Sequence, residues 1–294
     1  MIIVNMKGGL GNQLFQYAAG RALALRQTNK NSNSVVLKLD ISGYGENDGI
    51  DTMRHYSLSP FKIQADIATP DEINRMKYPY GIFSKAIRYI DKKVFRKFNI
   101  KYDRRIFNHE GGLYLDGFFQ TEKYFIDKEN DIRKDLNLIY SLSTKAREID
   151  QLIRNTADSV SLHVRRGDYE NDKKTNQRHG TCKVEYYARA LAFIASKIGK
   201  NIHVFVFSDD IDWVRKNMAF TFTSTYVSSP AIPDHEELIL MSKCHHNIIA
   251  NSTFSWWGAW LNQNKKKIVV APKQWSPKRL KNFKDITPSE WIRL

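Results

Sequence analysis

The sequence predicts an α/β protein whose two domains face a cleft. Its 294 residues exceed the usual size of one domain. In the second half, short apolar runs alternate with helical segments, which is typical of a parallel sheet covered on both faces. Polar loops directly follow several of these runs, at the sheet edge where open α/β sheets bind ligands. We therefore expect domains at residues 1–155 and 156–294, the second with a doubly wound parallel sheet.

The N-terminal half is expected to begin with a strand at residues 1–6, a glycine-rich loop and a helix from Leu14 to about Gln27. Further strands are expected at 35–39 and 112–119, and helices at 128–136 and 143–155. The stretch from Gly43 to Arg105 is polar and rich in Tyr and Lys, so we expect it to be less regular.

The C-terminal half alternates more cleanly between strand and helix patterns. Strands are expected at 159–164, 202–208, 224–227, 247–250 and 267–271. Helices are expected at 183–198, 211–217, 235–243 and 254–262. The carboxyl ends of parallel strands meet at one edge, so loops 165–166, 209–210 and 251–253 should line one nucleotide crevice. That crevice should face the Gly8–Gln13 loop of the first domain.

Composition points to a cytoplasmic protein with a substantial core. Hydrophobic residues make up 42% of the chain, yet no apolar run reaches the roughly 18 residues of a membrane span. The first residues lack the basic segment and cleavage site of a signal peptide. Cys182 and Cys244 are too few for a disulfide framework.

The net charge of +15 favours anionic partners, such as nucleotides, nucleic acid or acidic lipid surfaces. The segment from Lys85 to Arg105 carries nine basic and two acidic residues, with apolar residues near helical spacing. Such a helix can rest peripherally on the inner face of a membrane. Packing of its apolar face into the core is commoner, and we favour that interpretation.

Three long motifs give the sequence a specific resemblance. They are Lys7-Gly8-Gly9-Leu10-Gly11-Asn12-Gln13-Leu14-Phe15-Gln16-Tyr17-Ala18, His163-Val164-Arg165-Arg166-Gly167-Asp168-Tyr169 and Asn251-Ser252-Thr253-Phe254-Ser255-Trp256-Trp257-Gly258-Ala259-Trp260. With Phe207-Ser208-Asp209-Asp210 between the last two, the chain resembles the bacterial α-1,2-fucosyltransferases from residue 4 to about 275. The resemblance implies a GT-B fold, GDP-β-L-fucose as the donor and inversion to an α-linkage on O2 of a terminal galactose. The domain at 1–155 is then expected on the acceptor side, and the domain at 156–294 is expected to bind GDP-fucose. The acceptor itself, a glycan or lipid-linked oligosaccharide, is not specified by the resemblance.

The Arg165-Arg166 pair ends an apolar strand, where a guanidinium can grip a diphosphate bidentately. The resemblance assigns that role to Arg165. Neighbouring side chains of an extended segment point opposite ways, so Arg166 is expected to pair with a carboxylate such as Asp168. His163 lies on the same side as Arg165 and can meet the base or ribose.

Asp209 or Asp210 is expected to recognise guanine, whose N1–H and N2–H can both donate to one carboxylate. Asp210-Ile211-Asp212 also has the form of a metal-binding motif, but aspartates are favoured as caps at the start of a helix. We therefore expect no metal and no other cofactor, with cationic side chains and helix N-termini stabilising the leaving diphosphate.

Asn251, Ser252 and Thr253 precede a helix, so they can bind a phosphate oxygen, cap the helix, or do both. Gly9 and Gly11 permit close approach of the backbone to a ligand, and the resemblance places Asn12 near the fucose or the leaving oxygen. The alternative for this loop is a tight turn with Gln13 in solvent. The full expected donor-binding set is Gly9, Gly11, His163, Arg165, Arg166, Asp209, Asp210, Asn251, Ser252, Thr253 and Phe254.

Arg165, Asn12 and Asp168 are expected to act in catalysis, although no general base is obvious from the sequence. The sequence also has features of two other functions. Nucleic-acid binding fits the charge, but no nucleic-acid motif occurs and the basic cluster lies away from the loops, so we expect no such partner. A nucleotide-dependent oxidoreductase lacks support because Gly-x-Gly-x-x-Gly is missing.

Overall fold

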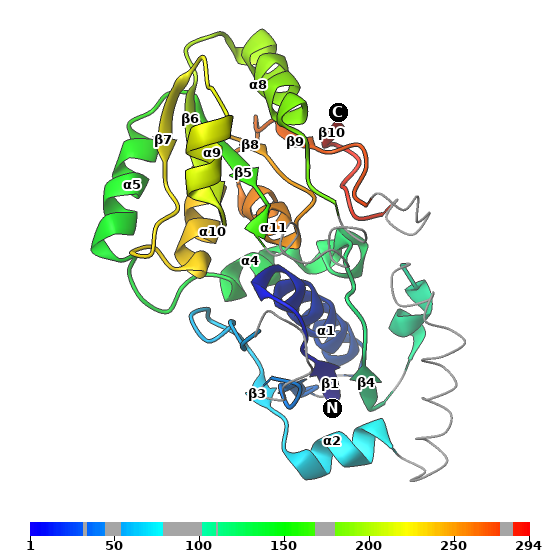
Figure 1. Ribbon diagram of the computed structural model, residues 1–294. Helices are drawn as coiled ribbons and strands as arrows, with labels where there is room; N and C mark the ends of the chain where they lie inside the picture. The colour runs from blue at the N-terminus through cyan, green and yellow to red at the C-terminus, as the bar shows by residue number, and fades with distance from the viewer. Residues whose placement is uncertain (32–33, 45–53, 79–101, 110, 168–179, 277–284) are drawn as a thin grey trace. The chain divides into compact units, whose positions relative to one another are not determined.

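The computed structural model describes residues 1–31, 34–44, 54–78, 102–109, 111–167, 180–276 and 285–294. The chain divides into two compact units (Figure 1). Unit 1 comprises Met1–Ile139 and Asn282–Pro288, and unit 2 comprises Tyr140–Lys281 and Ser289–Leu294. In the part of the chain that the structure describes, no helix combines the length and hydrophobicity needed to cross a membrane.

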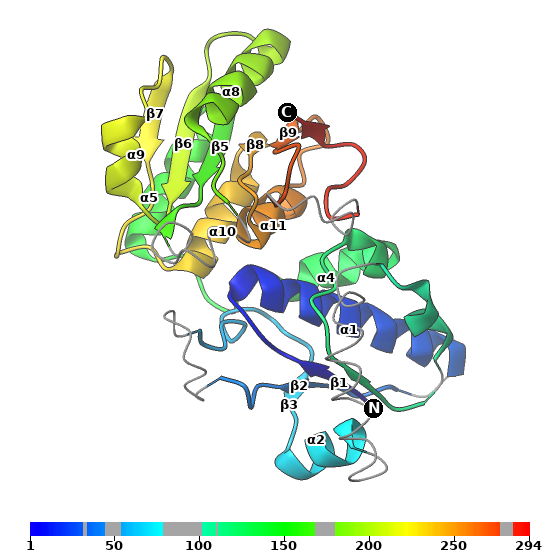
Figure 2. The same ribbon diagram turned by 45° about the vertical axis from the view of Figure 1, so that its right-hand side comes forward.

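Unit 1 is built on a parallel sheet with the strand order β3-β2-β1-β4 (Figure 2). Its strands are β1 (Ile2–Asn5), β2 (Leu37–Asp40), β3 (Asp66–Ile67) and β4 (Leu113–Leu115). Its α-helices are α1 (Leu10–Asn31), α2 (Pro70–Lys77) and α4 (Glu129–Asp135), with short 3-10 helices η2 (Arg104–Asn108), η3 (Glu122–Tyr124) and η4 (Ile126–Lys128).

Helix α1 packs closely on the central strand β1, whose apolar residues are fully buried. A Cβ atom at Gly20 would lie 2.4 Å from Cγ2 of Val4, so glycine lets the helix approach the sheet. The expected strand at 1–6 and the helix that follows it are confirmed. The helix begins earlier than Leu14, at Leu10, so Gly11 and Asn12 belong to its first turn.

The region 43–105 holds more regular structure than we expected. Helix α2 begins with a capping box, in which the Thr69 side chain accepts from the Glu72 amide and the Glu72 side chain accepts from the Thr69 amide. Pro70 at the first helical position also suits a helix start. Of the segment expected to form a basic amphipathic helix, residues 85–101 lie outside the described residues. Arg104 and Arg105 belong to η2.

Unit 2 contains a parallel sheet with the order β10-β9-β8-β5-β6-β7. The strands are β5 (Ser159–Val164), β6 (His203–Ser208), β7 (Thr223–Tyr226), β8 (His246–Ile248), β9 (Val269–Ala271) and β10 (Ile292–Arg293). The helices are α5 (Thr144–Arg154), α8 (Val184–Ile198), α9 (Ile211–Asn217), α10 (Asp234–Lys243) and α11 (Thr253–Leu261). If β5 to β10 are renumbered 1 to 6 and the sheet is followed from β7 to β10, the strand order is 3-2-1-4-5-6. This is the order of a doubly wound dinucleotide-binding fold.

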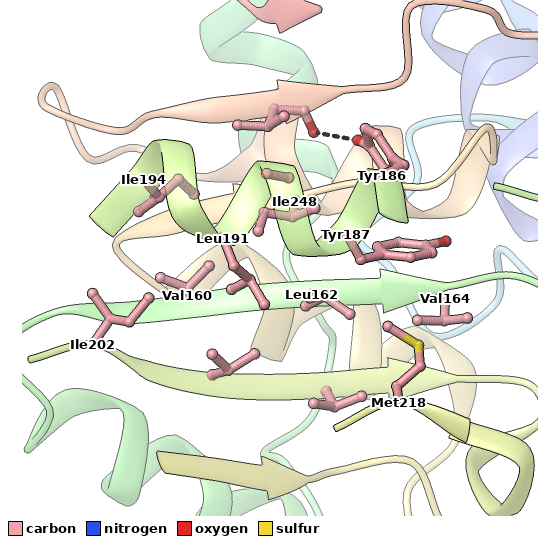
Figure 3. Packing of buried hydrophobic residues seen from close by; sticks show 14 of the residues in the cluster. Val160, Leu162, Val164, Tyr186, Tyr187, Leu191, Ile194, Ile202, Met218 and Ile248 are labelled. Carbon is pink, nitrogen blue, oxygen red and sulfur yellow. Dashed lines mark hydrogen bonds between the residues drawn. The ribbon is translucent and has the colours of Figure 1, made fainter. Parts of the chain in front are cut away.

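Helices cover both faces of this sheet, as the alternating sequence pattern predicted. Figure 3 shows α8 lying over β5, with Leu191 above Val160 and Leu162. On β6, Val204 and Val206 belong to the same cluster as the residues of α8. Phe205 and Phe207, which alternate with them, point to the other face and pack with α5 and α10. Alternate residues of one strand thus supply two separate cores.

The division between the units differs from the expected boundary after residue 155. Helix α5 belongs to unit 2, because its buried residues Ala146, Ile149 and Ile153 pack with Phe205 and Phe207 of β6. An amphipathic helix can bury its apolar side on either neighbouring sheet, and its sequence does not reveal which one.

Candidate donor-binding site

The direction of chain connections reverses between β5 and β8 of unit 2. From β5 the chain moves outward through β6 and β7, then returns to β8 on the other side of β5. Ligands of open α/β sheets bind outside the carboxyl ends of the strands at such a switch point. Val164 pairs with Ser208, and Leu162 with Ile248, so the loops that follow these strands emerge at one edge.

Arg165 and Asp209 meet at this edge. Arg165 Nη1 lies 3.2 Å from Asp209 Oδ2, and the two side chains are 20% and 23% exposed. The Arg166 amide donates to Asp209 Oδ1 over 2.8 Å. A Cβ atom at Gly167 would lie 2.6 Å from Asp209 Oδ2, so this position needs glycine. Asp209 therefore orients the arginine loop, a role the sequence suggested for Asp168, which lies outside the described residues.

Arg166 engages different partners from Arg165, in line with the expectation that the two side chains diverge. Its Cζ lies 3.5 Å from the centre of the Trp213 ring, and its Nε lies 3.7 Å from Asp210 Oδ2. Asp210 also caps α9, because its Oδ1 accepts from the Trp213 amide over 3.2 Å. The predicted capping role of Asp210 is confirmed. Among the described residues, no group of three or more His, Cys, Asp and Glu side chains is arranged to hold a metal ion.

His163 is buried in β5, and its ring centre lies 5.6 Å from that of Phe254. Burial, followed by the charge of Arg165, lowers the pKa of His163 to about 3. The imidazole is therefore neutral at physiological pH. Its Nδ1 has no hydrogen-bond partner among the described residues.

The segment 251–254 divides into a brace and a helix cap. The Asn251 amide donates to the carbonyl oxygens of Gly180 and Trp275, at 3.0 and 3.3 Å, and its oxygen accepts from the Cys182 thiol at 3.5 Å. Asn251 thus holds neighbouring loops, and its contact with the ligand stays a prediction. Ser252 caps α11 by accepting from the Phe254 amide. Thr253 is the first residue of that helix.

Glu237 was missed by the sequence reasoning. It lies partly buried in α10, and its side chain is hydrogen-bonded to Ser228 near Asp209. Burial raises its pKa to about 8; the Ser228 hydrogen bond opposes this shift, while the negative charges of Asp234 and Asp209 add to it. Acidic residues are common in the first turn of a helix, where they are usually solvated, so the local sequence carries no sign that Glu237 is special. Trp213, whose ring contacts Arg166, was also missed, and its position three residues after Asp210 is only a weak sequence signal.

The glycine loop of unit 1 is closely braced. Gly8 has φ +79°, and a Cβ atom there would lie 2.7 Å from Asn12 Nδ2. A Cβ atom at Gly9 would lie 3.4 Å from Arg54 Nη1. Asn12 Oδ1 accepts from Gln120 Nε2 at 2.8 Å.

Gln13 is fully buried, so the alternative that placed it in solvent was wrong. Its amide nitrogen donates to the carbonyl oxygens of Gly8 and His55, and its oxygen accepts from the Ser57 amide. These bonds fix the loop directly before α1 begins.

Comparison with known proteins places this arrangement in a family. The model of the family described as glycosyl transferase family 11 matches residues 1–294. An alpha-1,2-colitosyltransferase of Escherichia coli is 32% identical, with 100% of this chain and 99% of the relative covered. A galactoside 2-alpha-L-fucosyltransferase of Caenorhabditis elegans is 25% identical, covering 100% and 79%.

A solved structure of a mutant of Arabidopsis thaliana FUT1 in complex with GDP has a similar fold. Its TM-score is 0.51 at 12% identity, with 91% of this chain and 69% of that chain covered. The two parallel-sheet units and this likeness confirm the expected α/β fold of GT-B type. The family match over the whole length, together with the 32% identity to a full-length relative, shows that the chain belongs to glycosyl transferase family 11.

Proposed function

We propose that the protein is a galactoside α-1,2-fucosyltransferase, which moves L-fucose from GDP-β-L-fucose to O2 of a terminal galactose in a glycan. The observation that carries the proposal is Arg165 at the switch point of unit 2, on the same sheet edge as the amino end of α11. The name of the nematode relative, a galactoside 2-alpha-L-fucosyltransferase, supports the sugar and the linkage.

Arg165 is suited to the donor diphosphate. A guanidinium can bind phosphate oxygens through two parallel hydrogen bonds, and the amino end of α11 adds a positive field. Because Asp209 holds the Arg165 side chain at the strand end, little side-chain freedom is lost when the diphosphate binds. This arrangement supports transfer without a divalent metal or any other cofactor.

The nucleoside is expected on the β6 side of the sheet. In folds with this strand order, an acidic residue near the end of the second strand binds the nucleoside ribose. Asp209 and Asp210 follow that strand here. Each carboxylate oxygen accepts more than one hydrogen bond, so pairing with the arginine loop leaves acceptor capacity for guanine.

In the proposed reaction, the acceptor O2 attacks C1 of fucose on the face opposite the diphosphate. The bond between C1 and the phosphate oxygen breaks, and its electron pair stays on that oxygen, whose charge Arg165 stabilises. The proton of the acceptor hydroxyl passes to a base. Asp168 stays our prediction as a catalytic residue of the arginine loop, and Asn12 stays our prediction near the fucose or the leaving oxygen. One displacement inverts the configuration and yields an α-fucoside and GDP.

The test is proton NMR of the first product formed from GDP-fucose and a β-galactoside. We expect an α-fucoside on O2 of galactose. A β-fucoside would refute inversion, and an α-fucoside on another hydroxyl would refute only the linkage position. Failure to release GDP from GDP-fucose would refute the donor assignment.

A second donor is suggested by the 32% identical α-1,2-colitosyltransferase. Colitose is 3-deoxy-L-fucose, so the two donors differ by one hydroxyl group. A site that hydrogen-bonds a substrate hydroxyl discriminates strongly against the analogue that lacks it. The ratio of kcat/KM for GDP-fucose and GDP-colitose therefore decides between them, and we expect GDP-fucose to be preferred.

A further inference from the structure

Unit 1 has a switch point of its own. From β1 the chain passes through α1 to β2 and β3, and β4 then pairs with β1 on the opposite side. Ligands of open α/β sheets bind beyond the carboxyl ends of the strands at this point. Lys7 lies just beyond the end of β1, and Asp116 follows the last residue of β4.

Lys7 and Asp116 form an ion pair at this edge. Lys7 Nζ lies 2.6 Å from Asp116 Oδ1, and Asn5 Nδ2 donates to the same oxygen at 3.1 Å. The side chains of Lys7 and Asp116 are 33% and 22% exposed, so both can still reach a ligand. Lys7 Nζ also lies 5.0 Å from the centre of the Phe118 ring, which is partly buried.

The chain after β4 adopts a strained conformation beside this pair. Phe119 has φ 51°, a left-handed value that is unfavourable for a bulky residue. A Cβ atom at Gly117 would lie 3.0 Å from Phe119 Cζ, so glycine makes room for the ring. Gln120 then donates to Asn12 at the start of α1. Backbone strain of this kind is concentrated at ligand sites.

The chemistry of these groups suits an uncharged sugar. The ion pair has no net charge, which disfavours a diphosphate, while its carboxylate and ammonium groups can exchange hydrogen bonds with hydroxyl groups. An aromatic ring beside polar groups can cover the apolar face of a sugar ring.

We propose that Lys7, Asp116 and Phe118 form the subsite that binds the terminal sugar of the acceptor. The proposal rests on the function proposed above. In it, Asp116 accepts hydrogen bonds from acceptor hydroxyls, Lys7 donates to them, and Phe118 packs against the ring. These residues then set the affinity for the acceptor without affecting the nucleotide.

Unit 1 offers a matched control pair. Lys38 of β2 and Glu72 of α2 lie 2.5 Å apart, and their side chains are 19% and 23% exposed. The pair joins a strand interior to a helix, and neither residue lies beyond a strand end at the switch point. Lys38→Met thus removes a comparable ion pair away from the proposed subsite.

The experiment compares Asp116→Asn, Lys7→Met and Phe118→Leu with Lys38→Met and the wild type. The KM of a β-galactoside such as lactose is measured at saturating GDP-fucose, and the KM of GDP-fucose at fixed lactose. We expect the three subsite variants to raise the lactose KM at least about tenfold, the effect of losing about 1.4 kcal/mol of binding. The donor KM and the thermal shift with GDP should stay within about twofold and about 1 °C of wild type, and Lys38→Met should change neither KM.

A rise in the donor KM alone would assign the pair to fucose and overturn the proposal. Unchanged values of both KM would show that the pair only braces the fold. If the wild type uses no GDP-fucose, the proposed function is wrong, but the subsite is still tested by saturation-transfer NMR of lactose without donor. There, loss of the lactose signal in Asp116→Asn but not in Lys38→Met supports the subsite, and equal signals refute it.

Discussion

Replacement of Arg165 by alanine should reduce turnover by a factor of about 10²–10³. Arg165 Nη1 lies 3.2 Å from the Asp209 carboxylate. A phosphate oxygen at a similar distance would be attracted by about 5 kcal/mol at an effective dielectric constant of about 20. Desolvation offsets part of this, and loss of one preorganised group that stabilises the transition state typically costs about 3–4 kcal/mol. That cost corresponds to the stated loss in kcat.

Arg165→Lys should recover at most about tenfold of the loss, because a point charge on a flexible chain does not reproduce the planar, bidentate guanidinium. The assay is GDP release at saturating donor and acceptor. Arg215→Ala is a suitable control, since Arg215 lies on the Tyr226 ring at 4.3 Å and belongs to α9 of the same unit. An Arg165→Ala enzyme that folds normally and keeps more than a tenth of wild-type kcat would refute the reasoning.

Four other outcomes are expected. Burial raises the pKa of Glu237 from about 4.5 to about 8 in the folded protein, so its contribution to stability is lost as pH rises through this range. Glu237→Gln should therefore have a higher melting temperature than wild type at pH 8 and lose that advantage near pH 5. A difference in melting temperature that does not change with pH would contradict this. Gly167→Ala should lower turnover, measured by GDP release, because its Cβ would displace the Asp209 carboxylate, and wild-type turnover would show that the loop tolerates the shift. GDP should raise the melting temperature well above UDP or ADP, whereas equal shifts would refute recognition of guanine by Asp209 or Asp210. Activity should survive EDTA; complete loss, restored by a divalent metal, would make Asp210 and Asp212 candidate ligands.

The strands and helices of unit 2 were predictable because each short apolar run is bounded by polar residues. The predicted strand at 159–164 coincides with β5, and the predicted helix at 211–217 coincides with α9. Their convergence at one edge follows from parallel pairing alone. Very short strands such as β3 and β10, with two exposed residues each, lack any such pattern.

The local sequence could not show which polar side chains face a ligand. The position of Asn251 after a strand predicted ligand contact, but it did not reveal that the Asn251 amide also braces residues far away in the sequence. Glu237 owes its raised pKa first to burial and then to the nearby charges of Asp234 and Asp209, and the burial depends on how α10 packs. Lys7 and Asp116 are 109 positions apart, so only the pairing of β1 with β4 brings them together.

The route of the last ten residues affects how this protein can be made and divided. Lys123 of unit 1 forms an ion pair with Asp285, while Trp291 packs 5.5 Å from Trp256 and β10 pairs with β9 in unit 2. Neither unit is therefore a continuous piece of chain. During translation, unit 1 is completed only after Asn282–Pro288 has been made, and the sheet of unit 2 only after β10 has been made. Separate expression of residues 1–139 and 140–281 would remove the Lys123–Asp285 ion pair from unit 1 and strand β10 from unit 2, so split reporters or domain swaps in this protein need a circular permutation that keeps each of these segments with its own unit.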